Sequence, residues 1–399
     1  MTGKYFDYNA TTPIDPSVRE NLTNWASEWG NPSSIHWAGR GPKLLLREAR
    51  LKLATALGVS PLELVFTSGG SESNTTVLKS VFKTSSRGHF LTSQVEHPSV
   101  AKTMQALAAN GAKVDFIPVS REGVLDLDFY SEKLSTETAL VSVMTANNET
   151  GHIFPVGQLA ESARQVGALF HTDAVQALAK IPVSLKEWKV DYASFSAHKC
   201  YALKGVGLLY ARKGALIESL ILGGGQERHR RGGTENVLGI AAFGHMAEKF
   251  SLLEKKSDSQ VRELRDHLEK RIFSEISGTL VNGTGSPRLP NTSSLIISDV
   301  DGETLLMSLD LKGYAVSTGA ACSSGNPEPS PTLLAMGLTR AEAQSSLRIS
   351  LGVSQTEAQV DEFVETLKAI VDRLRSLGES GVDRRGSQNF VGSRGGVSV

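Results

Sequence analysis

The chain has few cysteines, no excess of charge and no long apolar run. Only Cys200 and Cys322 occur among its 399 residues, which excludes a disulfide framework and indicates reduced thiols. Lysine plus arginine equals aspartate plus glutamate, 42 each, so neither nucleic acid nor an anionic membrane surface is expected as a partner. No apolar run approaches the ~20 residues that span a bilayer, and residues 1–7 lack the apolar segment of a signal peptide. We therefore expect a cytoplasmic protein that neither spans nor binds a membrane.

The composition, 40% apolar and 21% charged, is typical of a globular protein, and the length suggests two domains. In the first 256 residues, short apolar runs alternate with amphipathic stretches, which predicts an α/β domain with a mainly parallel sheet. The predicted strands are 62–66, 89–93, 113–118, 138–144, 169–173 and 192–195, and the predicted helices are 42–57, 75–82, 157–166 and 237–255.

From residue 257 the pattern changes to helices at 260–276 and 355–377 and strands at 291–297 and 345–351. This pattern predicts a smaller α+β domain, joined by the N-terminal strand. We therefore divide the chain into a large domain, 14–256, and a small domain formed by 1–13 and 257–377. The last stretch, 378–399, is rich in glycine, serine and arginine, which predicts a disordered tail.

The stretch Ser194-Phe-Ser-Ala-His-Lys199 is a predicted buried strand that ends in hydroxyl, imidazole and amine groups. Most lysines are solvated surface charges. A lysine at the end of a buried strand instead loses solvation, which lowers its pKa and makes it a candidate Schiff-base amine. Asp173 ends another predicted strand. Pyridoxal phosphate needs this pair, a lysine for its aldehyde and a carboxylate for its pyridinium nitrogen.

Polar side chains also follow other predicted strands. The glycine turn within 67–74 precedes a helix, where it either binds phosphate through free N–H groups or only joins strand to helix. His97 stands before a helix as a cap, a packed side chain or a site residue, and Asn147-Asn-Glu-Thr-Gly151 is a polar cluster. Four basic residues, Arg228 to Arg231, form either a solvated loop or a contact for phosphate or carboxylate. Open α/β sheets bind ligands beyond the carboxyl ends of their strands.

Cys322 lies among small residues in Ser317-Thr-Gly-Ala-Ala-Cys-Ser-Ser-Gly-Asn326, which is unlike the surroundings of a buried cysteine. Such a loop exposes a thiol. Cys200, beside Lys199 in a segment expected to be buried, is predicted to be a small hydrophobe.

At this point the chain resembles the cysteine desulfurases, pyridoxal-phosphate enzymes related to class V aminotransferases, over roughly residues 5–375. It is most similar to the group whose reactive cysteine lies on a long loop. Ten segments in the family's order carry the resemblance: Asp7-Tyr-Asn-Ala-Thr-Thr, Gly30-Asn-Pro-Ser-Ser, Thr67-Ser-Gly-Gly-Ser-Glu-Ser-Asn, Glu96-His97, Asn147-Asn-Glu-Thr-Gly, Asp173-Ala-Val-Gln, Ser196-Ala-His-Lys, Arg231-Gly-Gly-Thr-Glu-Asn, Gly319-Ala-Ala-Cys-Ser-Ser-Gly and Ser346-Leu-Arg-Ile-Ser-Leu-Gly. The resemblance implies an aminotransferase-like fold of type I.

The resemblance also implies a role for each matched residue. Lys199 would bind the cofactor covalently and move the Cα proton, His97 would stack on the ring and act as acid or base, and Cys322 would take the sulfur of L-cysteine as a persulfide, leaving alanine. Arg348 would pair with the substrate carboxylate, with Asn148 beside the ring and the substrate. The remaining cofactor contacts would come from Asp173 and Gln176 at the ring, from Gly70, Ser71, Ser196 and His198 at the phosphate, and from Thr234 of the other subunit of a homodimer.

The implied partners are L-cysteine and a sulfur acceptor, such as an iron–sulfur scaffold protein to whose bound cluster Cys322 would transiently be a ligand. No resident metal is implied. Three positions depart from the family's usual pattern: the segment Cys200–Leu203, His229 and Val353. Selenocysteine lyase and class V aminotransferase are alternatives on the same fold, although an aminotransferase has no need of the Cys322 loop. An inactive scaffold protein is the non-enzyme alternative, and the intact Lys199 and Asp173 argue against it.

Overall fold

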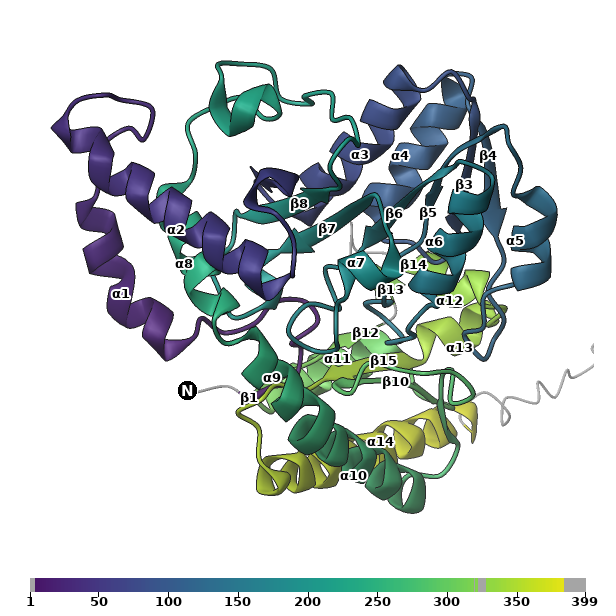
Figure 1. Cartoon of the computed structure of the whole chain (residues 1–399). Coiled ribbons are helices and arrows are strands. Elements are labelled where there is room, and N and C mark those ends of the chain that lie inside the picture. Colours follow the sequence, from purple (N-terminus) through teal and green to yellow (C-terminus); the bar gives the residue numbers. More distant parts are fainter. Residues whose placement is uncertain (1–3, 319, 322–327, 384–399) are drawn as a thin grey trace, which may run out of the picture.

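The computed structural model describes residues 4–318, 320–321 and 328–383. These residues form two parts: a larger one built on a seven-stranded sheet and, below it in the view of Figure 1, a smaller one built on a four-stranded sheet. No helix in these ranges is long and apolar enough to cross a bilayer.

The large sheet has the strand order β2-β8-β7-β6-β5-β3-β4. Each neighbouring pair is parallel except the two that involve β8, which runs antiparallel to both β2 and β7. The expected α/β class with a mainly parallel sheet is confirmed. The strands are β2 (Leu64–Thr67), β3 (His89–Ser93), β4 (Lys113–Ile117), β5 (Thr138–Ser142), β6 (Leu169–Asp173), β7 (Tyr192–Ser196) and β8 (Gly207–Ala211).

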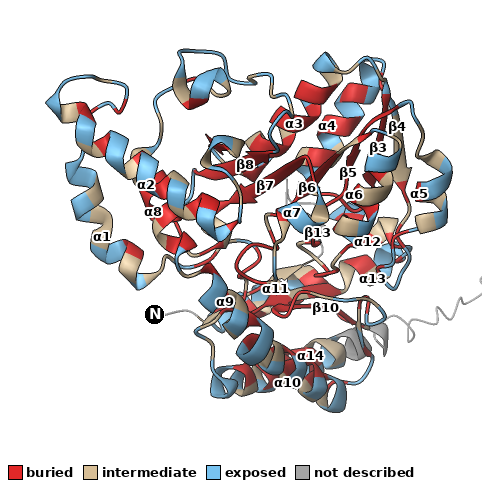
Figure 2. Ribbon diagram, in the orientation of Figure 1, coloured by how far each residue is buried: buried red, intermediate tan, exposed pale blue. Residues whose placement is uncertain are grey.

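Successive side chains of these strands point to opposite faces, and each face has its own apolar core. On one face Val65, Phe90 and Leu140 pack with α3 and α4. On the other, Leu91 and Val141 pack with α2, α6 and α8. Figure 2 shows the resulting buried layer along the sheet, with exposed residues on the outer sides of the helices. The helices are α1 (Pro16–Ser27), α2 (Arg40–Ala56), α3 (Gly70–Thr84), α4 (Pro98–Ala109), α5 (Leu127–Lys133), α6 (Val156–Gln165), α7 (Leu185–Trp188) and α8 (Val237–Ala247).

The small part has an antiparallel sheet of order β12-β15-β10-β9, with the N-terminal strand β1 paired to β11 beside it. Its strands are β1 (Lys4–Tyr5), β9 (Thr279–Val281), β10 (Thr292–Ile297), β11 (Tyr314–Ala315), β12 (Ser317–Thr318), β13 (Ala320–Ala321), β14 (Glu328–Pro329) and β15 (Ser346–Ser350). The remaining helices are α9 (Phe250–Lys256), α10 (Arg262–Glu275), α11 (Gly302–Leu311), α12 (Pro331–Ala335), α13 (Arg340–Gln344) and α14 (Glu357–Asp383). Of these, α9, α12 and α13 contribute to the core of the large part.

The alternation of β15 decides which of its side chains can reach the large part. Leu347 and Ile349 enter the core of the small part, together with residues of α10, α11 and α14. The residue between them, Arg348, therefore points to the opposite face of the sheet, which is turned toward the large part. The alternation of side chains along β15 thus places the Arg348 guanidinium between the two parts.

Several predicted element boundaries were wrong, and the helix expected over 237–255 differs most. The continuous helix expected over 237–255 is two helices, α8 and α9, and α9 continues through a π-helical turn, Ser257–Val261, into α10. The sequence does not reveal the break between the two helices, because both bury apolar residues against the same core and their apolar patterns run together. The domain limits at 14, 256 and 257 stay a prediction, supported by the change from one core to the other within this helical segment.

The disordered tail was expected to begin at residue 378, but α14 continues to Asp383. Extending a long helix costs little per residue even through a glycine, at about 1 kcal/mol relative to alanine. Residues 384–399 lie outside the described residues, so the rest of that prediction stays untested.

Candidate active site

A pocket of about 400 Å³ lies where β5, β6 and β7 end. Ligand pockets of open α/β sheets lie at this edge. The predicted site residues that line it are Gly70, Ser71, His97, Asn148, Asp173, Gln176, Ser196, His198, Lys199 and Arg348. Thr234 does not line it and is exposed on a loop, and Cys322 lies outside the described residues. The structure therefore brings together ten predicted residues from segments that are far apart in the chain.

Lys199 enters the pocket from the 3₁₀ turn Ala197–Lys199, which directly follows β7. Its Nζ donates hydrogen bonds to the backbone oxygens of Asn9, at 2.5 Å, and Ala10, at 2.6 Å. Burial lowers the pKa of Lys199 to about 8, and the positive charge of Arg348 lowers it further in the same direction. The amine is therefore partly neutral near physiological pH, which is the form that attacks an aldehyde.

Asp173 lines the pocket and is only 5% exposed. Its Oδ2 accepts a hydrogen bond from Asn74 Nδ2 at 2.6 Å, and its Oδ1 accepts one from the backbone N–H of Val175 at 3.0 Å. A buried carboxylate held in this way can pair with a protonated ring nitrogen.

His97 is linked to the same network and caps helix α4. Its Nδ1 accepts a hydrogen bond from the backbone N–H of Ser99 at 3.1 Å and lies 2.7 Å from Ser99 Oγ. Asn74 Nδ2 also donates to Ser99 Oγ, at 2.9 Å. Because Nδ1 is an acceptor, the neutral imidazole carries its proton on Nε2. One amide, Asn74, thus holds both the carboxylate and the histidine cap.

The pocket also offers donors of the kind that bind a phosphate. Gly70 and Ser71 begin helix α3, whose first N–H groups are free to meet an anion. A Cβ on Gly70 would lie 2.6 Å from Val175 Cγ2, so a larger residue would crowd the pocket. Burial lowers the pKa of His198 to about 4, and Lys199 and Lys204 add to the effect. The His198 ring is therefore neutral and would act as a hydrogen-bonding group.

Arg348 lies at the rim that faces the small part. Its Nη2 donates to Asp7 Oδ1 at 2.7 Å and its Nη1 to the backbone oxygen of Asn148 at 3.1 Å. Its Nε is buried and has no partner among the described residues. An unpaired buried donor is costly, and it would be satisfied by a carboxylate placed in the pocket.

Described strands precede and follow Cys322 in the sequence: Ala320–Ala321 pairs with Glu328–Pro329 as β13 and β14. Ser317 Oγ donates to Asp7 Oδ2 at 3.0 Å, and Ser330 Oγ donates to Glu149 Oε2 at 2.5 Å. Both acceptors are close to pocket residues: Asp7 pairs with Arg348, and Glu149 follows Asn148 in the sequence.

Cys200 is a buried free thiol. Burial raises its pKa to about 12, so it stays protonated and unreactive at physiological pH. This agrees with the expectation of a small hydrophobe. Three other positions that differ from the family's usual pattern also lie in or against the core. Ala202 is buried, and Leu203 and Val353 pack against the core of the large part.

The basic loop meets a carboxylate, one of the two contacts expected for it. Arg231 Nε donates to Glu72 Oε1 at 2.9 Å, while Arg230 donates to the backbone oxygen of Leu64 at 3.0 Å. His229 has a φ of 63°, the left-handed region that glycine adopts without strain. A histidine is therefore more strained than a glycine would be at this position.

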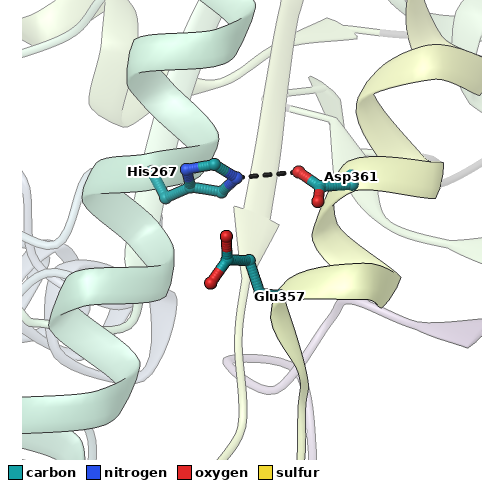
Figure 3. Close-up of side chains that lie close together, drawn as sticks. All are labelled: His267, Glu357 and Asp361. Carbon is teal, nitrogen blue, oxygen red and sulfur yellow. Dashed lines mark hydrogen bonds and ion pairs between the residues drawn. The ribbon is translucent and has the colours of Figure 1, made fainter.

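Two other features lie outside this pocket. His267, Glu357 and Asp361 lie close enough to hold a metal ion, and Figure 3 shows His267 and Asp361 joined across α10 and α14. Arg271 also pairs with Asp361 Oδ1, at 2.7 Å, so this group is an ion-pair cluster between two helices. A hollow of about 500 Å³ beside Asp191 and Arg212 contains none of the predicted site residues.

Four residues that organise this pocket were not predicted from the sequence. Asn9 supplies the backbone oxygen that Lys199 contacts, Asp7 pairs with Arg348, and Asn74 holds Asp173. Lys180 donates a hydrogen bond to the side-chain oxygen of Gln176. Asp7, Asn9 and Asn74 lie in segments that match the family, so a polar residue inside each matched segment was the available signal. Lys180 had no such signal.

The family model described as "Aminotransferase class-V" matches residues 4–363. "Cysteine desulfurase IscS" of Dictyoglomus turgidum is 43% identical over 376 residues, which cover 94% of this chain and 95% of that protein. A solved structure titled "NIFS-LIKE PROTEIN" is 38% identical with a TM-score of 0.86 and covers 93% of this chain and 99% of its own. A NifS-like protein from Rickettsia africae is 32% identical with a TM-score of 0.81, with the same coverage of 93% and 99%.

Proposed function

Because the chain belongs to the class V aminotransferase family, whose members are pyridoxal-phosphate enzymes, we propose that it is a cysteine desulfurase, which converts L-cysteine to L-alanine and passes the sulfur to its own Cys322. The observation that carries this proposal is that Lys199 and Asp173 line the same pocket. The identity of 43% with a named cysteine desulfurase supports it.

The residues of the pocket fit the cofactor. Asp173 is the buried carboxylate that would pair with the ring nitrogen, Lys199 the amine that would bind the aldehyde, and His97 the ring that would stack on the cofactor. Gln176 would donate to the ring oxygen. The phosphate would lie at the N-terminus of α3, which begins at Gly70. The set proposed for the phosphate is Gly70, Ser71, Ser196 and His198, together with Thr234 of the partner subunit.

Bound pyridoxal phosphate makes the Cα proton of an amino acid acidic and draws electrons from its Cβ. The protein must hold and move that proton. The Lys199 amine has a pKa lowered to about 8, so it can accept and return a proton near neutral pH. Nε2 of His97 is the second candidate for this task, because Nδ1 is already an acceptor for Ser99.

The substrate would be held by its carboxylate. Arg348 presents a planar guanidinium whose Nε is unpaired, and a bidentate contact to a carboxylate suits that geometry. The side chain of Asn148 lines the same pocket and would lie beside the substrate. These contacts would fix the Cα–H bond in one orientation and direct the substrate's sulfur toward the Cys322 segment.

In the sulfur-transfer step the Cys322 thiolate attacks the sulfur of the substrate. A new S–S bond forms while the Cβ–S bond breaks, and the electron pair left on the carbon side is finally protonated to give alanine. The persulfide then passes to an acceptor. Cys200 cannot take this role, because its thiol is buried and its pKa is raised to about 12.

We further propose that two copies of the chain form a homodimer that shares its sites. In Figure 1 the loop between α1 and α2 and the loop between β8 and α8 both extend outward from the large part, at its left and upper side. They carry exposed large apolar residues: Trp29, Ile35, Trp37 and Leu222 are 76%, 97%, 73% and 85% exposed. Apolar groups gathered in this way are typical of a covered surface. Thr234 lies on the second loop, outside its own pocket.

The acceptor would be an iron–sulfur scaffold protein or another sulfur-accepting protein in the cytoplasm, and Cys322 would transiently be a ligand to a cluster held by such a scaffold. The test is release of alanine from L-cysteine by the purified, cofactor-loaded protein with a thiol reductant, with sulfide measured beside it. Equal amounts of alanine and sulfide are expected. A higher rate with L-selenocysteine would favour a selenocysteine lyase, and amino transfer to a keto acid without sulfide release would contradict the proposal.

A further inference from the structure

Lys180 is a buried amine directly behind the pocket. It lies in the turn that follows β6, four positions after Gln176, and it is only 7% exposed. Its Nζ donates to Gln176 Oε1 at 2.6 Å and to Asn9 Oδ1 at 2.9 Å. Both acceptors belong to residues that line the pocket. The amine therefore contacts the site through two neutral side chains.

The charges around Lys180 are unusual for a buried lysine. The charged or titratable groups that face it are Lys199, Arg348 and the Cys200 thiol. Among the described residues, no carboxylate forms an ion pair with it. Burial lowers the pKa of Lys180 to about 7, and the positive charge of Lys199 acts in the same direction. A buried cation without an anion is costly, so a negative group in the pocket would stabilise it.

The contact from Lys180 fixes the orientation of the Gln176 amide. An ammonium group has donors and no acceptor, so the Gln176 atom that faces it must be the oxygen. The nitrogen of the same amide donates one hydrogen to the backbone oxygen of Asn9, at 3.0 Å. Its second hydrogen has no partner among the described residues and remains for the pocket.

We propose that Lys180 is a positioning residue for the cofactor: by holding Gln176 Oε1, it directs a Gln176 N–H at the oxygen of the cofactor ring and brings a positive charge close to that oxygen. This inference rests on the proposed function, since it requires pyridoxal phosphate in the pocket with its ring oxygen near Gln176. It goes further by assigning a task to a residue that touches neither cofactor nor substrate.

The consequence concerns the proton shared between the ring oxygen and the Lys199 nitrogen of the loaded protein. A directed N–H and a nearby positive charge stabilise the oxygen as an anion, so the shared proton is released at a lower pH. Loss of that proton changes the visible absorption of the bound cofactor. The pH at the midpoint of this change therefore reports on Lys180 directly and does not depend on turnover.

The experiment compares the wild-type protein with Lys180→Met, both loaded with pyridoxal phosphate and titrated by absorption without substrate. We expect the midpoint to rise by about one pH unit in Lys180→Met, a typical effect of one nearby charge. The matched control is Asn291→Ala. Asn291 donates to the same Asn9 oxygen at 3.1 Å and is not in contact with Gln176, so its removal should leave the midpoint unchanged.

A second comparison uses Gln176→Leu as the background. If Lys180 acts through Gln176, adding Lys180→Met to Gln176→Leu shifts the midpoint by less than it does in the wild type. Full additivity, or an equal shift in Asn291→Ala, would overturn the inference. If Lys180→Met does not fold, Lys180→Gln keeps a donor and removes the charge, and it should shift the midpoint upward by a smaller amount.

Failure of this inference can be distinguished from failure of the proposed function. A wild-type protein that takes up no pyridoxal phosphate contradicts the proposed function itself. A wild-type protein that is loaded and desulfurates cysteine, with the same midpoint in Lys180→Met, contradicts only the task given to Lys180.

Discussion

Asp7 Oδ1 lies 2.7 Å from Arg348 Nη2, and the same carboxylate accepts a hydrogen bond from Ser317 at its other oxygen. Ser317 and Arg348 are also cross-strand neighbours in the β12–β15 pair. The N-terminal segment thus connects the residue proposed to bind the substrate carboxylate with the strand that leads into the Cys322 segment. A substrate that binds Arg348 would therefore contact a side chain whose partner, Asp7, is also bound by Ser317.

Arg348→Lys should raise KM for L-cysteine roughly tenfold to hundredfold, because a lysine cannot pair with a carboxylate through two parallel hydrogen bonds. Steady-state kinetics measures this change, and the absorption of the bound cofactor should stay unaltered. Arg288→Lys is the matched control, since Arg288 is equally buried, at 11% exposed, and pairs with Glu269 away from the pocket. An equal rise of KM in both variants would contradict the role given to Arg348.

Borohydride reduction should attach the cofactor to Lys199, as peptide mapping would reveal. Lys180 is the critical comparison, because it is also a buried amine with a pKa lowered to about 7. Only the neutral amine attacks the aldehyde, and the pKa of Lys199 is about 8. The rate at which the apo-protein captures the cofactor should therefore rise with pH and level off above about 8. A label on Lys180 would refute the assignment.

Asp173→Asn should retain cofactor and lose activity by roughly a hundredfold, equivalent to about 2.7 kcal/mol, because the ring nitrogen loses its negative partner. Turnover of the loaded variant is the measurement. Asp191→Asn serves as the control, since Asp191 is a buried carboxylate that pairs with Arg212 at 2.6 Å outside the pocket. It should lower the free energy of unfolding and leave kcat close to that of the wild type. Near-normal turnover in Asp173→Asn would make that residue structural.

Cys322→Ser should keep the fold and the cofactor and form no persulfide, as intact mass after brief exposure to L-cysteine would show. Cys200→Ser should cost about 1 kcal/mol of stability and leave sulfur transfer intact, because the Cys200 thiol is buried with its pKa raised to about 12. An added sulfur on Cys200, or undiminished alanine release in Cys322→Ser, is incompatible with the proposed carrier.

Mixing Lys199→Ala chains with Thr234→Ala chains should partly restore activity if the sites are shared. Each mixed dimer would combine both changes in one site and leave the other site intact. Exposed Thr234 lies outside the pocket of its own chain, which is the reason to expect a partner's contribution. Light scattering would establish the oligomeric state. A fully active monomer, or a mixture no more active than its separate components, would exclude shared sites.

Much of the pocket could be predicted from local sequence, because its residues follow short buried strands. Asp173 and Ser196 end strands whose residues are all or almost all buried, and polar residues at the ends of such strands meet at one edge of a parallel sheet. In both cases a short stretch of sequence contains the signal. Arg348, in contrast, was predicted only through the resemblance to the family.

The contacts that complete the pocket could not be predicted in this way. Lys199 contacts Asn9 across 190 positions, and Arg348 pairs with Asp7 across 341, so no local pattern records them. Nothing in the sequence indicated a role for Lys180, because the turn that buries it after β6 has no periodic pattern. The boundary between α8 and α9 was missed for a related reason, since both helices bury apolar residues against one core.

The N-terminal segment of residues 7–10 has a consequence for biosynthesis. It is translated before its partners, which include Lys199, about 190 positions later, and Arg348, 341 positions after Asp7. A nascent chain on the ribosome can build the strands of the large sheet in sequence, but it cannot close the pocket until β15 has emerged. Cofactor capture in its final geometry is therefore a post-translational event, and a truncated chain released early would lack the complete site.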